Sequence, residues 1–327
     1  MVIRLILSFI ISFAVSVGAG FVFIPMLRRM KVGQSIQEDG PVWHKNKQGT
    51  PTMGGIIFIS GILVACLVAG FSGIMEGDHT ILFVLAFALV YALIGFLDDY
   101  EKLKKKQNLG LTAIQKFALQ LMAAVAFVLM MEFTGNLTTD VYLPFFNISF
   151  SLPSAVYYIF AAFVIVGTVN AVNITDGIDG LSTGVTIPVA VAFSLVATLW
   201  NDPANGVIAS AVVGGLIGFL IFNFYPAKVF MGDTGSLFLG GAVCALAFSM
   251  DMPLILITLG FVYFVETLSV IIQVTYFKLT KGKRVFKMAP IHHHFEMCGW
   301  YEYKVFAVFT SVSVIFAIVS YLGVMNR

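Results

Sequence analysis

Ten apolar segments of membrane-spanning length, separated by polar connections, constrain the fold of this chain more than any other feature. A helix needs roughly 20 apolar residues to cross the hydrocarbon core of a bilayer. The segments lie near residues 3–27, 53–71, 79–97, 113–131, 155–172, 184–200, 207–224, 235–250, 253–277 and 304–325. With 59% hydrophobic and only 11% charged residues, the composition excludes a soluble globular domain. We therefore expect an all-α polytopic membrane protein with ten transmembrane helices, forming a single domain over 1–327.

Positive charge is distributed very unevenly between the connections. The odd-numbered connections, with their adjoining helix ends, contain 17 of the 19 lysines and arginines, and the even-numbered connections contain none. Because basic residues are retained on the cytoplasmic side, the odd connections are predicted to be cytoplasmic and both termini extracytoplasmic. In the connection 132–154, alternating polar and apolar residues indicate a small β-hairpin near 138–152 on the outer face. An irregular loop is the alternative there.

The polar stretch 170–181 lies between two apolar segments. Its polar side chains recur at every third position, at Asn170, Asn173, Asp176 and Asp179. Steps of three drift around a helix, so these side chains cannot share one helical face. Gly177 and Gly180 favour a helix end near Thr175, followed by a turn that folds the carboxylates back toward the asparagines. A solvated loop explains the polarity but not this combination beside apolar helix ends, so we predict a functional site here.

Two other stretches place carboxylates at predicted helix ends. Asp98 and Asp99 directly follow an apolar segment, where charge is costly unless it is paired or bound to a cation. Lys102 can reach either aspartate on a continuing helix, but one ion pair accounts for one aspartate better than for both. Asp233 lies between two glycines just before another apolar segment. Helix capping explains Asp233 alone, but not the asparagine, aromatic residues and lysine grouped upstream.

The run 44–55 combines lysines, Thr50 and glycines beside a predicted helix start. The positive end of a helix suits an anionic ligand. Taken alone, however, this run is explained better by an ordinary helix start with lysines that set the topology.

Ionisable residues also lie within and after the ninth apolar segment. Glu266 and Gln273 are seven residues apart, so they lie on nearly the same helical face and point into the bundle or a cavity. Structural and functional roles for Glu266 both fit. The run His292–His294 follows a basic segment, and at most two of these histidines can serve one site. Phosphate contact is favoured over zinc binding, because the other candidate ligands are carboxylates rather than thiolates.

The five polar stretches singled out in the connections all lie in odd-numbered connections and are predicted to face the cytoplasm, which brings several carboxylates together with lysines, histidines and asparagines. Oxygen-rich groups of this kind suit Mg²⁺, which usually keeps some waters and bridges substrate phosphates. The residues therefore predict Mg²⁺-dependent phosphoryl transfer at the inner membrane surface. A transporter is the rival class, but its ionisable groups are expected near the membrane midplane between repeats.

Five motifs, in order along the whole chain, resemble those of the bacterial phospho-N-acetylmuramoyl-pentapeptide-transferases. This family is a branch of the polyprenyl-phosphate N-acetylhexosamine-1-phosphate transferases. The motifs are Gly-Thr-Pro-Thr-Met-Gly-Gly at 49–55, Asp-Asp at 98–99, Asn-Ala-Val-Asn-Ile-Thr-Asp-Gly-Ile-Asp-Gly-Leu at 170–181, Phe-Met-Gly-Asp-Thr-Gly-Ser at 230–236 and Ala-Pro-Ile-His-His-His-Phe-Glu at 289–296. The aspartate motifs belong to the superfamily, whereas the histidine run is more particular to this branch.

The resemblance implies transfer of phospho-N-acetylmuramoyl-pentapeptide from UDP-N-acetylmuramoyl-pentapeptide to undecaprenyl phosphate, giving lipid I and UMP in peptidoglycan biosynthesis. A related transferase of the same superfamily is the alternative. The resemblance also implies Mg²⁺ as cofactor, a homodimer, inhibition by nucleoside antibiotics, and no nucleic-acid partner. It places the protein in the bacterial inner membrane with its active site on the cytoplasmic face.

The same resemblance implies roles for individual residues. Asp98, Asp99 and Asp233 are the expected catalytic residues, with Asp233 as the Mg²⁺ ligand and Phe230 stacking on uracil. The other residues expected to bind substrate are Lys45, Thr50, Lys102, Asn170, Asn173, Asp176, Gly177, Asp179, Asn223, Gln273, His292, His293 and His294.

Overall fold

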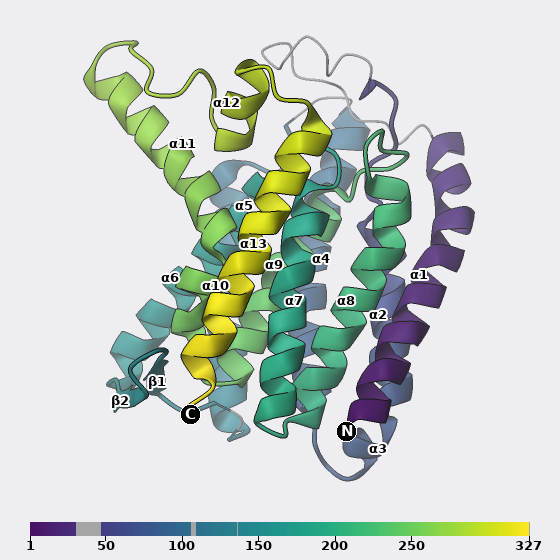
Figure 1. Ribbon diagram of the computed structural model, residues 1–327, viewed down its shortest axis with the longest axis vertical. Helices are drawn as coiled ribbons and strands as arrows, with labels where there is room; N and C mark the ends of the chain where they lie inside the picture. Colours follow the sequence, from purple (N-terminus) through teal and green to yellow (C-terminus); the bar gives the residue numbers. More distant parts are fainter. Residues whose placement is uncertain (31–46, 106–108, 136, 327) are drawn as a thin grey trace.

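The computed structural model describes residues 1–30, 47–105, 109–135 and 137–326, and this part of the chain is almost entirely helical (Figure 1). Nine of its helices are long and apolar enough to cross a membrane. They are α1 (Val2–Arg29), α4 (Thr80–Lys105), α5 (Ala113–Phe133), α6 (Ser154–Thr175), α7 (Leu181–Leu199), α8 (Pro203–Asn223), α9 (Gly232–Ser249), α11 (Phe261–Leu279) and α13 (Glu302–Val324). Helices predominate because hydrocarbon offers backbone groups no other hydrogen-bond partners. The prediction of a multi-pass helical membrane protein is confirmed.

The prediction of ten full-length spans is not confirmed, since two of the expected segments are shorter or interrupted. In place of 53–71, the structure has α2 (Gly55–Ala69), whose 15 residues end at Gly70, followed by α3 (Phe71–Met75). The expected segment 253–277 is divided into a 3₁₀ turn η2 (Pro253–Ile255), α10 (Leu256–Leu259) and α11. Gly260 ends α10 and precedes α11, so the apolar run is not one straight helix.

The predicted hairpin is present. Strands β1 (Asp140–Leu143) and β2 (Ile148–Ser151) pair antiparallel, with Val141 opposite Phe150. Both chain termini lie at the same end of the bundle as this hairpin, whereas α12 (Ile291–Met297) lies at the opposite end (Figure 1). Which end faces the cytoplasm remains a prediction from the charge distribution.

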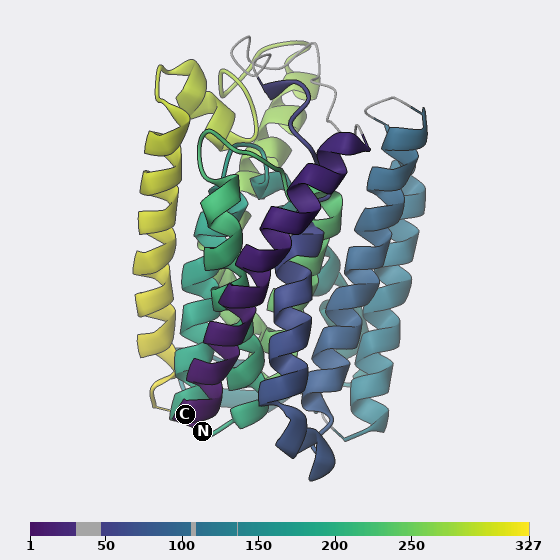
Figure 2. The same ribbon diagram turned by 90° about the vertical axis from the view of Figure 1, so that its right-hand side faces the viewer.

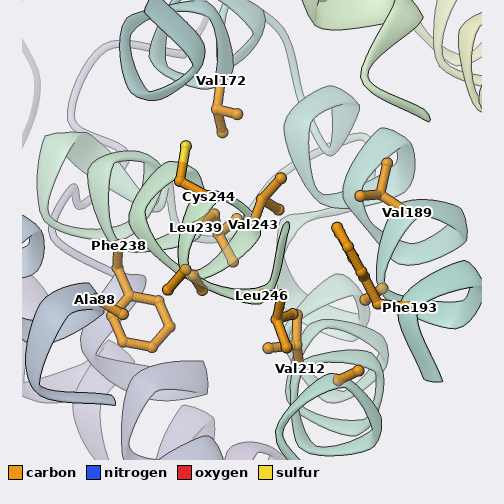
Figure 3. Packing of buried hydrophobic residues seen from close by; sticks show 14 of the residues in the cluster. Ala88, Val172, Val189, Phe193, Val212, Phe238, Leu239, Val243, Cys244 and Leu246 are labelled. Atoms are coloured by element: carbon orange, nitrogen blue, oxygen red, sulfur yellow. The ribbon is translucent and has the colours of Figure 1, made fainter. Parts of the chain in front are cut away.

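The centre of the bundle is formed by α9, which packs against α4, α6 and α2, and by α7 and α8 beside it. Figure 3 shows Val172 of α6, Val189 and Phe193 of α7, and Val212 of α8 gathered around the apolar side chains of α9. Most of α8 and α9 is buried inside the protein, whereas most residues of α1, α5, α11 and α13 lie outside the buried core. The outer helices are therefore those available to lipid.

Helix α1 crosses obliquely over α2 and α8 (Figure 2) and is attached to α8 by a regular set of hydrogen bonds. The hydroxyl groups of Ser8, Ser12 and Ser16 donate to backbone carbonyls one turn apart on α8, at distances of 2.6–2.9 Å. All three serines are buried. Because apolar burial does not drive helix association inside lipid, close packing and hydrogen bonds of this kind hold the two helices together.

Glycines allow α9 to approach its neighbours closely at the end of the bundle opposite the termini. A Cβ atom on Gly95 of α4 would overlap the backbone carbonyl of Asp233, at the start of α9. Gly55 and Gly235 likewise bring the starts of α2 and α9 into backbone contact. The N-terminal end of α9 is thereby fixed between α2 and α4, where the predicted polar residues lie.

Candidate active site

A compact cluster of charges joins the ends of α4, α5 and α9. The Lys102 ammonium lies 2.6 Å from Oδ2 of Asp98 and 2.7 Å from Oδ2 of Asp233. Lys116, in the first turns of α5, contributes a second ammonium 2.9 Å from the same oxygen of Asp233 and 3.8 Å from Asp98. Asp98 is buried, and its other oxygen accepts a hydrogen bond from the backbone N–H of Leu111. Two lysines thus compensate two carboxylates that come from different helices.

Asp99 has a different role from Asp98, although the two are adjacent. Its carboxylate accepts hydrogen bonds from the backbone N–H groups of Asp233 and Thr234 and from the Thr234 hydroxyl, at 2.7–3.2 Å. Those N–H groups belong to the first turn of α9, where backbone N–H groups have no carbonyl partner within the helix. Asp99 therefore caps α9 from a neighbouring helix, and Lys102 is 4.0 Å from it.

The two asparagines of α6 lie at different depths. The Asn173 amide donates to Oδ1 of Asp233 and to the Ser236 hydroxyl, both at 2.7 Å, so it belongs to the charged cluster. Asn170, one turn deeper in the bundle, donates to the side-chain oxygen of Gln120 on α5 and to the carbonyl of Val166. The structure therefore brings Asn173, but not Asn170, to Asp233.

Helix α6 ends at Thr175, as predicted, and the two aspartates beyond it separate. Asp176 is partly exposed near the cluster. Burial by surrounding atoms, and then the carboxylates of Asp233, Asp99 and Asp179, raise the pKa of Asp176 to about 8. Asp179 is buried on the other side of the turn, where it binds Lys47 at 2.6 Å and accepts a hydrogen bond from the N–H of Ala227.

The stretch before α9 packs against the loop 47–54. The Phe230 N–H donates to the carbonyl of Pro51, and the Phe230 carbonyl accepts from Gly54. The partly exposed Phe230 ring faces the Lys47 ammonium at 6.0 Å. Asn223 is buried and braces this stretch, since it accepts from Thr183 and donates to the carbonyl of Val229. Lys45 lies outside the described residues, and Thr50 is partly exposed in the loop.

The three histidines of α12 point to different partners, as their spacing predicts. His292 is completely buried and its Nδ1 lies 2.9 Å from Oε2 of Glu266, which is buried as well. A Cβ atom on Gly177 would overlap the Nε2 of His292, so the imidazole packs directly against the turn after α6. Nδ1 of His293 contacts Glu296 at 2.6 Å. The N–H of Lys287 donates to Nδ1 of His294.

Gln273 is engaged with the loop after α11. Its side-chain oxygen accepts from the N–H groups of Val285 and Phe286, and its amide donates to the carbonyl of Phe286. The oxygen and the nitrogen of this side chain therefore both have backbone partners. Its position orders the basic loop that precedes α12.

Four functional candidates, Lys47, Lys116, Glu302 and Gln120, were not selected from the sequence. Lys116 contributes only to the charge asymmetry that predicts the topology. Lys47 belongs to the run 44–55, which an ordinary helix start with topology-setting lysines explains. Glu302 and Gln120 stand singly at or within helices. For Glu302 the available signal was its place directly before an apolar segment, the same signal that identified Asp98 and Asp99.

The cluster has the chemistry expected of a divalent-cation site. In the part of the chain that the structure describes, no three His, Cys, Asp or Glu side chains converge on one point. However, one oxygen of Asp98 and one of Asp233 already bind the same cationic nitrogen, that of Lys102. Mg²⁺ is typically held by one or two carboxylates together with water and substrate phosphate. The residues present therefore fit Mg²⁺.

Comparisons with known proteins agree with this arrangement. Residues 81–251 match the family Glycosyl transferase family 4, and residues 47–59 match the phospho-N-acetylmuramoyl-pentapeptide-transferase signature 1. The chain is 46% identical over 323 residues to the phospho-N-acetylmuramoyl-pentapeptide-transferase of Clostridium acetobutylicum, covering 98% of this chain and 99% of that one. The chain belongs to the phospho-N-acetylmuramoyl-pentapeptide-transferase family. Relatives of the same name from Caldanaerobacter subterraneus and Bacillus cytotoxicus are each 47% identical, covering 98% and 96% of this chain and 99% and 96% of their own length.

Membership of the phospho-N-acetylmuramoyl-pentapeptide-transferase family agrees with the location of the polar residues. The range 81–251 runs from α4 to the end of α9 and contains Asp98, Lys102, Asn173 and Asp233. The signature at 47–59 covers the loop that packs on Phe230 and the first turn of α2. The resemblance noted in the sequence is confirmed, and the protein is a membrane-embedded transferase.

Proposed function

We propose that this protein transfers phospho-N-acetylmuramoyl-pentapeptide from UDP-N-acetylmuramoyl-pentapeptide to undecaprenyl phosphate, forming lipid I and UMP. Family membership over nearly the full chain supports the reaction. The observation that carries the proposal is the cluster of Asp98, Lys102, Lys116 and Asp233 at one end of a membrane bundle. A site at that end can serve a lipid phosphate at the interface and a donor that arrives from solution.

Both reacting partners are anionic, so the site must reduce their mutual repulsion before bond formation. Lys102 and Lys116 present two ammonium groups on the same oxygen of Asp233. Because phosphoryl transfer depends mainly on positioning and charge stabilisation, these lysines are suited to hold the acceptor phosphate and the donor diphosphate in line.

Asp233, with Asp98 beside it, is the proposed holder of Mg²⁺. When bound there, Mg²⁺ would neutralise the charge that develops on the departing UMP. Asn173 donates to the oxygen of Asp233 that faces away from the lysines and so fixes the orientation of the carboxylate. The supporting observation is the pair of carboxylate oxygens that already converge on one cation.

We favour direct attack by the lipid phosphate over a covalent aspartyl-phosphate intermediate. A phosphate oxyanion is already a competent nucleophile near neutral pH. Each oxygen of Asp99 accepts at least one hydrogen bond, and Asp233 is bound by two lysines and Asn173. The Asp98–Asp99 pair is the proposed general base for a remaining acceptor proton: Asp99 accepts hydrogen bonds from the first turn of α9, and Asp98 from Lys102 and the Leu111 N–H.

The remaining expectations concern location and partners. The charge distribution and the position of the cluster support a bacterial inner-membrane protein whose active site opens to the cytoplasm. Homodimer formation and inhibition by nucleoside antibiotics follow from the family resemblance. A transporter is disfavoured, because the charged cluster lies at helix ends rather than at the middle of the bundle.

Purified protein supplied with undecaprenyl phosphate, Mg²⁺ and either UDP-N-acetylmuramoyl-pentapeptide or UDP-N-acetylglucosamine tests the proposal directly. UMP release together with lipid I formation is expected with the first donor only. Preference for UDP-N-acetylglucosamine would instead assign the related superfamily activity. No UMP release with either donor would contradict the proposed function.

A further inference from the structure

A second charged cluster, separate from the one at Asp233, lies beside Phe230. The Lys47 ammonium is 2.6 Å from Oδ1 of Asp179 and 2.6 Å from Oε2 of Glu302. The same oxygen of Glu302 accepts a hydrogen bond from the N–H of Asp179 at 3.2 Å. The other oxygen of Asp179 accepts from the N–H of Ala227 at 2.8 Å.

These contacts join four segments that are distant in the sequence. Lys47 begins the family signature, Asp179 lies in the turn between α6 and α7, Ala227 lies between α8 and α9, and Glu302 is the first residue of α13. Together they surround the base of the loop that carries Phe230, whose ring is 6.0 Å from the Lys47 ammonium. Lys47, Asp179, Ala227 and Glu302 thus come from other segments than the Asp233 cluster, which is built from α4, α5 and α9.

Two buried carboxylates and one ammonium group make up the charges of this cluster. The side chains of Asp179 and Glu302 are only 2% and 6% exposed, and Lys47 is 17% exposed. Two carboxylates so close together and so little hydrated repel each other unless a cation lies between them. Lys47 supplies that cation. Its ammonium therefore links the turn at Asp179 to Glu302 and lies beside the ring of Phe230.

We propose that Glu302 is a positioning residue for the nucleotide part of the donor. It holds Lys47 and Asp179 so that the turn after α6 and the ring of Phe230 keep the relative position needed to receive a uracil nucleotide. This inference rests on the proposed function and on the role that the family resemblance implies for Phe230, stacking on uracil. Because Glu302 acts through Lys47 and Asp179, its loss affects recognition of the nucleotide but not the transfer step at Asp233.

Steady-state kinetics and UMP binding to the full-length protein in detergent provide the test. Glu302→Ala should raise the donor KM and the UMP Kd by about tenfold or more, the size expected for a lost charge-assisted hydrogen bond. The kcat and the KM for undecaprenyl phosphate should stay within about threefold of the wild type. Glu302→Asp, which keeps the charge, should recover part of the UMP affinity. Glu76→Gln, at an exposed position far from the cluster, is the matched control.

A double substitution separates this role from simple helix stabilisation. Lys47→Met leaves two carboxylates facing each other, so it should weaken UMP binding more than Glu302→Gln does. Adding Glu302→Gln to Lys47→Met removes one of the two negative charges, so UMP binding should improve relative to Lys47→Met alone. Glu302→Gln should therefore weaken UMP binding in the wild-type background and strengthen it in the Lys47→Met background. A residue that merely caps α13 would weaken binding in both.

Either of two results overturns the inference: a fall in kcat with unchanged donor KM, or no change of sign in the double variant. A thermal unfolding scan shows whether each variant is folded. If Glu302→Ala or Glu302→Gln does not fold, the UMP affinity of Glu302→Asp is the deciding measurement. Failure of the proposed function is distinguishable, because it shows in the wild type as absence of both UMP binding and UMP release.

Discussion

Asp98 and Asp233 come from different helices and bind the same ammonium group, that of Lys102, at 2.6 and 2.7 Å. Gly95 makes this possible, since any side chain there would push α4 away from the start of α9. The two carboxylates therefore already converge on one position for a cation at the end of the bundle.

Replacing Asp233 with Asn should reduce activity by roughly a hundredfold or more and raise the Mg²⁺ concentration needed for what remains. The amide keeps an oxygen but loses the charge that attracts Mg²⁺. Transfer activity measured across a Mg²⁺ titration checks this, with Glu76→Gln as control. Near-normal turnover with an unchanged Mg²⁺ requirement would assign the metal elsewhere, first to Asp98.

Asp99→Asn and Asp98→Asn should differ in their effect on stability. Both oxygens of Asp99 accept from the start of α9, and Asp99→Asn replaces one of them by an amide nitrogen that cannot accept. The substitution should therefore lower the free energy of unfolding by about 1 kcal/mol and lower the Tm. Asp98→Asn should reduce turnover with a smaller change in Tm. Thermal unfolding and activity of the two purified variants provide the comparison. Equal Tm shifts for both would rule out the capping role.

Gly177→Ala should destabilise the protein and lower its activity, because the added methyl group would overlap the buried imidazole of His292. In a His292→Ala background that overlap disappears, so adding Gly177→Ala should change the Tm little. Thermal unfolding of both single variants and the double variant measures the coupling. If the two Tm changes simply add, His292 does not support this turn.

The Mg²⁺ requirement should fall as pH rises from about 7 to 9. The pKa of Asp176 is raised to about 8, so the group is mostly protonated below that pH and negative above it. Deprotonation adds negative charge near Asp233 and strengthens cation binding. The Mg²⁺ concentration giving half-maximal activity, measured at several pH values, tests this. Asp176→Asn should show a flatter dependence, and an identical slope in that variant would exclude Asp176 as the cause.

Labelling of single cysteines in intact cells should reveal the orientation. A membrane-impermeant reagent added outside should modify a cysteine at position 139, beside the hairpin, but not one at position 104, near the charged cluster. The reason is the concentration of lysines and arginines at the cluster end of the bundle. Modification at position 104 would reverse the assigned topology and the cytoplasmic location of the site.

Much of the architecture could be predicted because lipid imposes simple rules on the sequence. Apolar length predicted most spans, and period-2 alternation predicted the hairpin at 140–151. The interruption at Gly260 was not predicted, because a single glycine within an apolar run is common in membrane helices. The shortened α2 was missed for the same reason, since composition alone does not show that it ends at Gly70.

The candidate site was located by the sequence but not resolved into parts. Clustered aspartates and glycines indicated connections that the structure brings together, because charge beside an apolar segment is costly and therefore informative. The division of labour between Asp98 and Asp99 depends on where α9 begins relative to α4, which no local pattern shows. Glu302 is a similar case, because its ion pair with Lys47 joins residues that are far apart in the sequence and no local pattern predicts it.

The three serines of α1 also bear on the order in which the protein assembles. Their acceptors lie on α8, which leaves the ribosome long after α1 has entered the bilayer. Until then each hydroxyl can bond only to a carbonyl in the preceding turn of its own helix, as serines in membrane helices commonly do. Docking of α8 exchanges three local bonds for three between helices. Helix α1 is therefore inserted early, but its hydrogen bonds to α8 form late. In a chain truncated before α8, α1 should be free to rotate.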